Sequence, residues 1–407
     1  MGGRALAVQW NEAHGETAVE KKQRDEADGP VTSSAEKTAL ESTKEETGAP
    51  LRRLNIAGIP ESIELEESNS GRRVLRIRGG YSGERLGYGI GSGDFNDDGV
   101  EDVILTGVAP QAGGRTERAR VIFGQRDGFE EAIFSVGDLD GSNGFTVVGD
   151  AVEVSKPALY YDTLTGDFNG DGVADFLIFS TEHLTPDNEA DLCHVVFGRK
   201  NLNGGAASLN LTDPPLNGTN GFVIVPDRFG LVYGTFGFQP HVSGDFNGDG
   251  IDDILVAETD STGTESRAYI IFGSTSGFGA SLELASLNGT SGFVIVNKAG
   301  SGKATSAGDL NGDGIDDIFF GAPLADSLAG RVHVIFGRNT TEAGDFNATV
   351  DVSALNGSDG FAITGDSGDR LGGYMSGAGD FNADGVNDIL LGAPDGASGR
   401  LGVPARD

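Results

Sequence analysis

A nine-residue segment with the pattern Asp-x-Asn-x-Asp-Gly-x-x-Asp constrains the fold of this chain more than any other feature. It occurs five times, beginning at Asp94, Asp167, Asp245, Asp309 and Asp380. Each copy has oxygen donors at positions 1, 3, 5 and 9, and a glycine at position 6, where the backbone must turn sharply. Ca²⁺ accepts carboxylate, amide and carbonyl oxygens together. The pattern therefore predicts five calcium-binding loops.

Each loop is predicted to bind one ion through the side chains at positions 1, 3, 5 and 9 and the backbone carbonyl at position 7. The predicted metal ligands are Asp94, Asn96, Asp98, Val100 and Asp102; Asp167, Asn169, Asp171, Val173 and Asp175; Asp245, Asn247, Asp249, Ile251 and Asp253; Asp309, Asn311, Asp313, Ile315 and Asp317; and Asp380, Asn382, Asp384, Val386 and Asp388. Mg²⁺ fits less well because it demands a tighter octahedron. We expect about five structural Ca²⁺ ions per chain. The segment Asp345–Val350 lacks the Asp and Gly of positions 5 and 6, so we expect no metal there.

The residues after each loop exclude an EF-hand. An EF-hand loop needs an acidic residue at position 12, where the five copies have Leu105, Ile178, Val256, Phe320 and Leu391. The closing Asp is followed by a short apolar run, such as Ile254–Ala257, which is typical of a buried strand. We therefore expect each loop to connect the two strands of a β-hairpin.

The segments around the loops repeat in a fixed order, at intervals of about 70 residues. A Gly/Ser-rich strand enters the loop and a buried strand leaves it. A third strand ends in Phe-Gly, as at Phe272-Gly273, and a fourth follows a Leu-Asn/Asp-Gly turn, as at Gly292–Val296. Small residues in the first strand allow close approach of neighbouring strands. This order predicts an all-β fold, a β-propeller of four-stranded blades with five blades visible.

The two ends of the repeat region complement each other. The segment Val74–Gly79 has the pattern of an outer fourth strand, whereas the last blade has two clear strands and a weak third at Gly399–Val403. We expect Val74–Gly79 to complete the last blade, because this would remove an open sheet edge.

Composition separates the repeat region from the segment before it. Residues 1–60 are rich in Glu, Lys, Thr, Ser and Ala without a sustained hydrophobic period. We predict a disordered polyampholyte tail over 1–60 and a propeller domain over 61–407. The formal net charge of −33 disfavours nucleic acid and anionic membranes as partners. No stretch reaches the ~20 apolar residues of a transmembrane segment, and Met1–Trp10 lacks the apolar core of a signal peptide.

The sequence contains no catalytic constellation. Its five histidines show neither His-Glu-x-x-His nor a zinc spacing, and no Gly-x-Ser-x-Gly segment is present. His194 and His333 fall within apolar third strands, where a satisfied buried histidine is expected. The single cysteine, Cys193, excludes an internal disulfide. We therefore predict a protein that is not an enzyme.

Phe-Gly, the metal pattern and Gly-Ala-Pro together resemble the FG-GAP repeats of the integrin α-chain β-propeller and its bacterial relatives. Gly-Ala-Pro is intact at Gly321–Pro323 and Gly392–Pro394, and the resemblance covers about residues 63–401. The integrin propeller has seven blades, so the resemblance leaves open a closed five-bladed ring or a truncated seven-bladed one.

The resemblance also implies a function. It implies a calcium-stabilised binding module in cell adhesion or cell-surface ligand recognition, located outside the cell or on its surface. A protein or glycan ligand is expected on the loop face opposite the calcium loops. The alternative is a hydrolase or lyase on the same scaffold, or the accessory propeller of a phospholipase-D-like enzyme.

Overall fold

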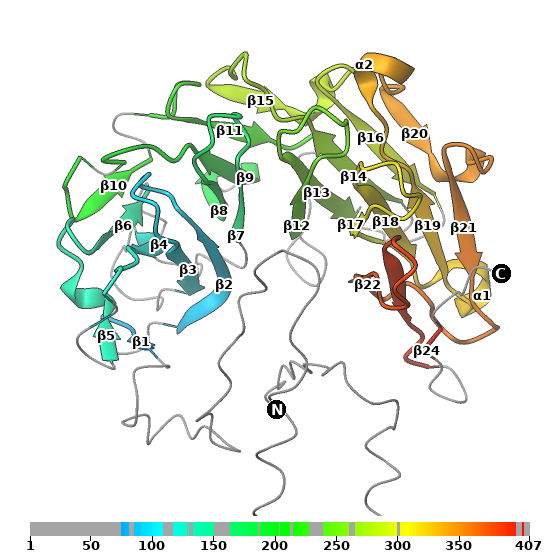
Figure 1. Ribbon diagram of the computed structural model, residues 1–407, viewed down its shortest axis with the longest axis horizontal. Helices are drawn as coiled ribbons and strands as arrows, with labels where there is room; N and C mark the ends of the chain where they lie inside the picture. Colours follow the sequence, from blue (N-terminus) through cyan, green and yellow to red (C-terminus); the bar gives the residue numbers. More distant parts are fainter. Residues whose placement is uncertain are drawn as a thin grey trace, which may run out of the picture. The chain divides into compact units, whose positions relative to one another are not determined.

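The computed structural model of the chain describes residues 75–80, 85–108, 117–127, 129, 133–149, 163–185, 188–202, 204–211, 215–227, 239–259, 265–298, 302–395 and 401–402 (Figure 1). The chain divides into two units, Met1–Ser62 and Ile63–Asp407. All described residues belong to the second unit. The predicted disordered tail, residues 1–60, lies outside them.

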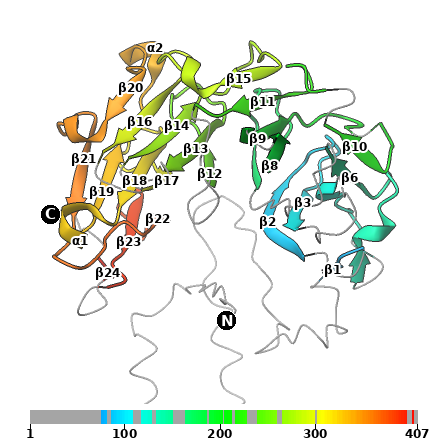
Figure 2. The same cartoon turned by 180° about the vertical axis from the view of Figure 1, so that it is seen from behind.

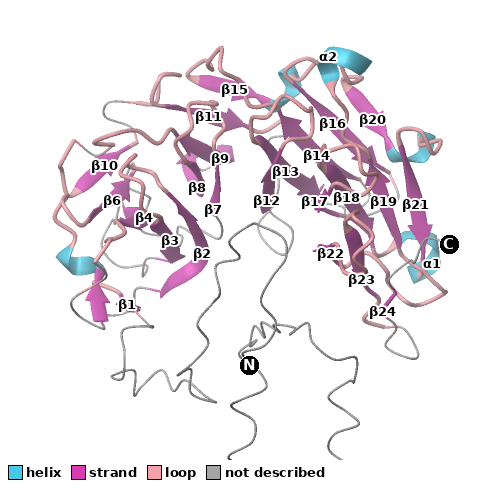
Figure 3. Cartoon of the chain, viewed as in Figure 1, coloured by secondary structure: helices cyan, strands magenta, loops and turns pink. Residues whose placement is uncertain are grey.

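The second unit is built from antiparallel sheets that repeat one strand order. The first sheet holds β2 (Arg85–Gly93), β3 (Asp102–Val108), β4 (Glu117–Ile122) and β6 (Gly144–Val148); the second β7 (Thr163–Gly166), β8 (Asp175–Thr185), β9 (Asn188–Val196) and β11 (Gly221–Val225); the third β12 (Gln239–Gly244), β13 (Asp253–Thr259), β14 (Ser266–Ile271) and β16 (Gly292–Asn297); the fourth β17 (Lys303–Gly308), β18 (Asp317–Ala322), β19 (Arg331–Ile335) and β21 (Gly360–Thr364); and the fifth β22 (Tyr374–Gly379), β23 (Asp388–Gly392) and β24 (Leu401–Gly402). Among the described residues, helices are limited to single turns such as α1 (Ala325–Leu328) and α2 (Thr340–Ala343) (Figure 3). The predicted all-β, propeller-like fold is confirmed.

Short strands that the sequence analysis did not predict link each sheet to the next. The strands β10 (Ser208–Asn210), β15 (Ser281–Glu283) and β20 (Thr349–Asp351) each pair in parallel with the fourth strand of the preceding sheet, namely β6, β11 and β16. We call these three the covering strands. The strand β5 (Ile133–Ser135) pairs in the same way with β1 (Arg76–Arg78). One-turn 3₁₀ helices follow β5, β15 and β20, at Val136–Asp138, Leu284–Ser286 and Val352–Ala354.

The hydrophobic core lies between successive sheets. The first strands β2, β7, β12, β17 and β22 contact one another in chain order, so neighbouring sheets lie side by side (Figures 1 and 2). A Cβ on Gly93 would lie 2.6 Å from the Cβ of Ala174, in the loop between β7 and β8 of the next sheet. Glycine in a first strand therefore permits the close approach that the sequence predicted.

The predicted closing strand has a different partner. β1 pairs with β5, with Ile77 opposite Phe134. This parallel pairing is the one that fourth strands make, so β1 has the predicted character of an outer fourth strand. Within the described residues, however, β24 pairs only with β23, and no strand extends the fifth sheet further. The expected pairing of Val74–Gly79 with the last blade is therefore not found there.

No helix in the described part of the chain is both long enough and apolar enough to cross a membrane.

Candidate metal centres

All five predicted loops connect the first strand of a sheet to the second, as the sequence predicted. Asp245–Asp253, for example, joins β12 to β13. Positions 4 and 6 have left-handed backbone, with φ of 75° at Gly248 and 82° at Gly250. In the first and fifth loops, position 4 is Asp97 and Ala383, which adopt the same conformation at φ of 58° and 61°. Position 6 is glycine in every copy because only glycine adopts this conformation without steric cost.

The aspartate at position 1 folds back over its own loop. In the third loop, Oδ1 of Asp245 accepts the backbone N–H of Asp249 over 3.1 Å, and Oδ2 accepts that of Gly250 over 2.8 Å. The other four loops repeat both bonds, over 2.6–3.1 Å. This carboxylate therefore sets the shape of the loop by capping its backbone donors.

Positions 3 and 5 complete the inward-facing oxygen set. The Oδ1 atom of Asn247 accepts the N–H of Asp249 over 2.9 Å, and Oδ1 of Asp249 accepts the N–H of Ile251 over 2.9 Å. In the first loop, Oδ1 of Asn96 is buried without a hydrogen-bond partner. An orphaned amide oxygen is costly to bury, and a cation beside it would satisfy it.

The aspartate at position 9 has a structural role that the sequence analysis missed. Asp253 is fully buried. Its Oδ2 accepts the N–H of Phe246 over 2.9 Å, and its Oδ1 accepts the N–H of Gly273 over 2.8 Å. The same two bonds are made by the equivalent Asp102, Asp175 and Asp317. This residue therefore joins the start of the loop to the Phe-Gly end of the third strand.

The glycine of Phe-Gly is required by the same contact. A Cβ on Gly273 would lie 2.5 Å from the carbonyl oxygen of Asp252. The sequence signal was the Phe-Gly pair that follows the closing Asp in four of the five copies. In the fifth loop, Nδ2 of Asn382 donates to Oδ1 of Asp388 over 3.2 Å.

Burial raises the pKa of the closing aspartates Asp102, Asp175, Asp253 and Asp317. It raises the pKa of Asp102 and Asp317 to about 7 and that of Asp175 to about 8, and it raises the pKa of Asp253 well above its ordinary value. The backbone hydrogen bonds oppose this effect, whereas the carboxylates at positions 5 and 1 add to it. Three such carboxylates repel one another unless a cation lies near them.

Consecutive loops are hydrogen-bonded to each other. The backbone N–H at position 8 donates to the carbonyl oxygen at position 1 of the preceding loop, over 3.0–3.3 Å at Ala174, Asp252, Asp316 and Asn387. The Oδ2 atom of Asp252 also accepts the N–H of Asp167 over 2.9 Å. The five loops therefore form one continuous row along the same end of the sheets.

The donor type of each loop fits calcium, with three carboxylates, one amide and a carbonyl. In the structure the side-chain oxygens at positions 1, 3 and 5 of the third loop accept N–H groups of their own loop. No group of three or more His, Cys, Asp or Glu side chains in the described residues is arranged to hold a metal ion. The ligand assignments therefore remain predictions. In the segment Asp345–Val350, where the sequence predicted no metal, Oδ2 of Asp345 accepts the hydroxyl of Thr290 over 2.6 Å.

The opposite end of the sheets carries ion pairs. Nη1 of Arg267 lies 2.9 Å from Oδ2 of Asp227, and its Nε lies 2.8 Å from Oε1 of Glu265. The hydroxyl of Tyr269 donates to the same Asp227 oxygen over 3.4 Å. Arg267 stands near the start of β14 and is paired with Glu258, at the end of β13 that is far from the loop. We call Asp227, Glu265 and Arg267 the arginine cluster.

The residues considered for chemistry lie in strand interiors. Cys193 is buried, and His194 is buried beside it. His333 is also buried, and burial lowers its pKa to about 4, with the charge of Arg331 as a second cause. Its Nδ1 atom has no hydrogen-bond partner. The expectation of a satisfied strand histidine is therefore wrong for His333.

Comparison with known proteins agrees with this repeat geometry. The family model described as FG-GAP repeat matches residues 301–335, which contain β17, the fourth loop and β18. Integrin alpha-5 of Xenopus laevis is 33% identical over 125 residues, which are 29% of this chain and 11% of the relative. Integrin alpha-8 of Homo sapiens is 35% identical over 115 residues, 26% of this chain and 10% of the relative.

The chain carries an FG-GAP repeat at residues 301–335 and is similar to integrin α chains. The matched segments span about a tenth of the length of these relatives. In this chain, the FG-GAP signature corresponds to physical contacts, because the Phe-Gly glycine donates to the aspartate that closes the metal loop.

Proposed function

We propose that this FG-GAP protein is a calcium-stabilised binding module that recognises a protein or glycan ligand at the end of its sheets opposite the metal loops. Its setting would be cell adhesion or ligand recognition outside the cell or on its surface, and it would act without catalysis. The row of hydrogen-bonded loops is the observation that carries the proposal, because it gives the metal end a structural task. The similarity to integrin α chains supports it.

Calcium would act on the loops as a structural ion. The side chains at positions 1, 3, 5 and 9 would hold it, together with the position-7 carbonyl. Its charge would offset the repulsion among the three carboxylates of each loop and would favour the ionised form of the closing aspartate. Since each loop is bonded to the next, this stabilisation would extend along the row.

The arginine cluster is our candidate for ligand contact. Side chains of Arg267 and Asp227 are each 24% exposed, so they are partly accessible to a ligand. An Arg held by two carboxylates presents fixed N–H donors, which suit the carboxylates of acidic peptides and the hydroxyl or carboxylate groups of glycans.

Binding is tested by applying the full chain, in millimolar Ca²⁺ or in EGTA, to a glycan array and to immobilised extracellular-matrix proteins. We expect calcium-dependent binding to a defined probe, weakened by about tenfold or more in Arg267→Ala, since charge-assisted hydrogen bonds are lost. Arg338→Ala is the matched control, because Arg338 contacts Phe346 outside the cluster. Absence of binding to every probe in calcium, or release of a cleaved product from any of them, would contradict the proposal.

A further inference from the structure

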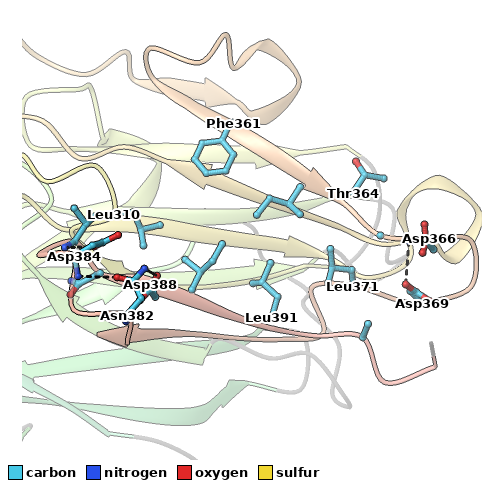
Figure 4. A pocket seen from close by; sticks show the side chains of 16 residues that line it. Leu310, Phe361, Thr364, Asp366, Asp369, Leu371, Asn382, Asp384, Asp388 and Leu391 are labelled. Carbon is cyan, nitrogen blue, oxygen red and sulfur yellow. Dashed lines mark hydrogen bonds between the residues drawn. The ribbon is translucent and has the colours of Figure 1, made fainter. Parts of the chain in front are cut away.

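A hollow lies between β21 and the fifth sheet (Figure 4). Its volume is about 590 Å³. Phe361 and Ile363 line it from β21, and Ile389 and Leu391 line it from β23. Phe361 is 39% exposed. This surface is therefore an apolar groove between two sheets.

The equivalent phenylalanines of the other fourth strands are covered. Phe145, Phe222 and Phe293 are fully buried. The ring of Phe222 stacks on Phe278 at 4.3 Å, and the ring of Phe293 stacks on Phe346 at 4.2 Å. Each stacking residue stands just before a covering strand, β15 or β20.

The covering strands also fill the space that is hollow beside β21. Between the third and fourth sheets, Val350 and Val352 pack in one cluster with Ile295, Ile318 and Phe320. The equivalents of the last three residues beside the hollow are Ile363, Ile389 and Leu391. In the described part of the chain, no strand pairs with the outer edge of β21. Among the described residues, no covering strand therefore fills the groove.

The sequence before β1 has the order that surrounds a covering strand. After Leu282-Glu283-Leu284 come a turn at Asn288-Gly289 and the fourth strand β16. After Val350-Asp351-Val352 come a turn at Asn356-Gly357 and the fourth strand β21. In the same order, Ile63-Glu64-Leu65 is followed by Asn69-Ser70-Gly71 and the fourth strand β1. Residues 63–65 thus have the pattern and chain position of a covering strand.

We propose that residues 63–65 of this same chain bind along the outer edge of β21 and fill the hollow. The known pairs place Leu282 opposite Ile224 and Val350 opposite Ile295, which sets Ile63 opposite Ile363 and Glu64 opposite Thr364. Ile63 and Leu65 then take the places of Val350 and Val352. The segment adds a parallel strand to an exposed edge, where main-chain hydrogen bonds give affinity and apolar side chains fix the register.

Engineered cysteines test the register in the full chain. Directly opposed residues of neighbouring strands lie within the Cα separation that a disulfide tolerates. We therefore expect Glu64→Cys with Thr364→Cys to form an intrachain disulfide about tenfold faster than the out-of-register pair Glu67→Cys with Thr364→Cys. Peptide mass mapping identifies the bond and separates it from Cys193. Equal rates would overturn the proposal, and a disulfide between chains would assign the groove to a second copy instead.

A spectroscopic measurement checks the occupancy without a cross-link. In a chain carrying Trp10→Phe and Phe361→Trp, the new indole reports on the groove. We expect Ile63→Asp to shift its emission to longer wavelength and to increase acrylamide quenching about twofold, because an acid does not stay in an apolar site. Leu54→Asp, the matched change outside the segment, should leave both unchanged. Identical spectra for the two variants would overturn the proposal, and circular dichroism confirms that each variant is folded.

Discussion

The backbone N–H of Gly273 donates to Oδ1 of Asp253 over 2.8 Å. This bond ties the Phe-Gly end of the third strand to the residue that closes the metal loop of the same sheet. The other carboxylate oxygen of Asp253 accepts the N–H of Phe246 at the start of the loop. One buried side chain therefore fixes both ends of the loop against a neighbouring strand, and this structural role can be separated by mutation from the proposed metal-binding role.

Replacing Gly273 by alanine should destabilise the fold. The added Cβ would lie 2.5 Å from the carbonyl oxygen of Asp252, so strand and loop must separate. We expect a loss of about 1–3 kcal/mol, the usual cost of overpacking. Gly279→Ala is the control, because a Cβ there would meet only the carbonyl oxygen of Ser281, at 3.4 Å. Chemical denaturation in calcium measures the free energy of unfolding of both variants. Equal losses would show that the close contact between Gly273 and the loop does not limit stability.

Asp253→Asn should destabilise the chain with or without calcium. An amide nitrogen cannot accept a hydrogen bond, so either Phe246 or Gly273 would keep an unsatisfied buried N–H, at a cost of about 1–3 kcal/mol. Asp249→Asn at the exposed position 5 should lose stability only when calcium is present. The test compares the free energies of unfolding of the two variants in calcium and in EGTA. If Asp253→Asn lost stability only in calcium, Asp253 would act as a metal ligand and not as a structural hydrogen-bond acceptor.

Removing calcium should lower the melting temperature sharply. A ligand that binds only the folded state adds about 2.7 kcal/mol per site at about 100-fold above its Kd. Calorimetric melts in EGTA, and again after calcium is restored in excess, measure the effect. Magnesium at the same concentration should restore little, because it prefers a tighter shell. A melt unchanged by EGTA would remove the metal assignment from all five loops.

His333 should make stability depend on pH. Its pKa is about 4 in the folded chain, against an ordinary value of 6.5. The unfolded chain therefore binds the extra proton between these values, so the contribution of His333 to stability is complete above pH 6.5 and is lost as the pH falls towards 4. The loss should reach about 3 kcal/mol. His333→Leu removes this titration while the carboxylates stay common to both chains. Parallel stability curves for the two chains between pH 4 and 6.5 would contradict it.

The sequence predicted the strands around each metal loop well because each element carries its own local signal. The loop at Asp245–Asp253 specifies its turn through glycine and Asn, and Ile254–Ala257 specifies the buried strand that follows. The covering strands were missed because Ser281–Glu283 is only three residues long and pairs with β11 of another sheet. Its alternation becomes interpretable only when it is compared with Thr349–Asp351.

The role of Asp253 was missed for a different reason. The metal pattern alone already explained an Asp at position 9. Nothing further in the sequence of a single copy therefore indicated its hydrogen bonds to Phe246 and Gly273. The partner of β1 was also beyond the sequence, because a fourth strand has two edges and its pattern does not say which edge is paired.

The stacking position before each covering strand should accept leucine in place of phenylalanine. Phe278 stacks on Phe222, whereas the buried Leu202 packs in the same cluster as the equivalent Phe145. Both residue types thus close the space over a fourth strand. We expect Phe278→Leu to cost less than about 1.5 kcal/mol and Phe278→Ala about 3 kcal/mol, because alanine leaves a cavity. Urea denaturation of the two variants measures the difference. Equal losses would show that ring stacking, and not the filling of space, holds this position.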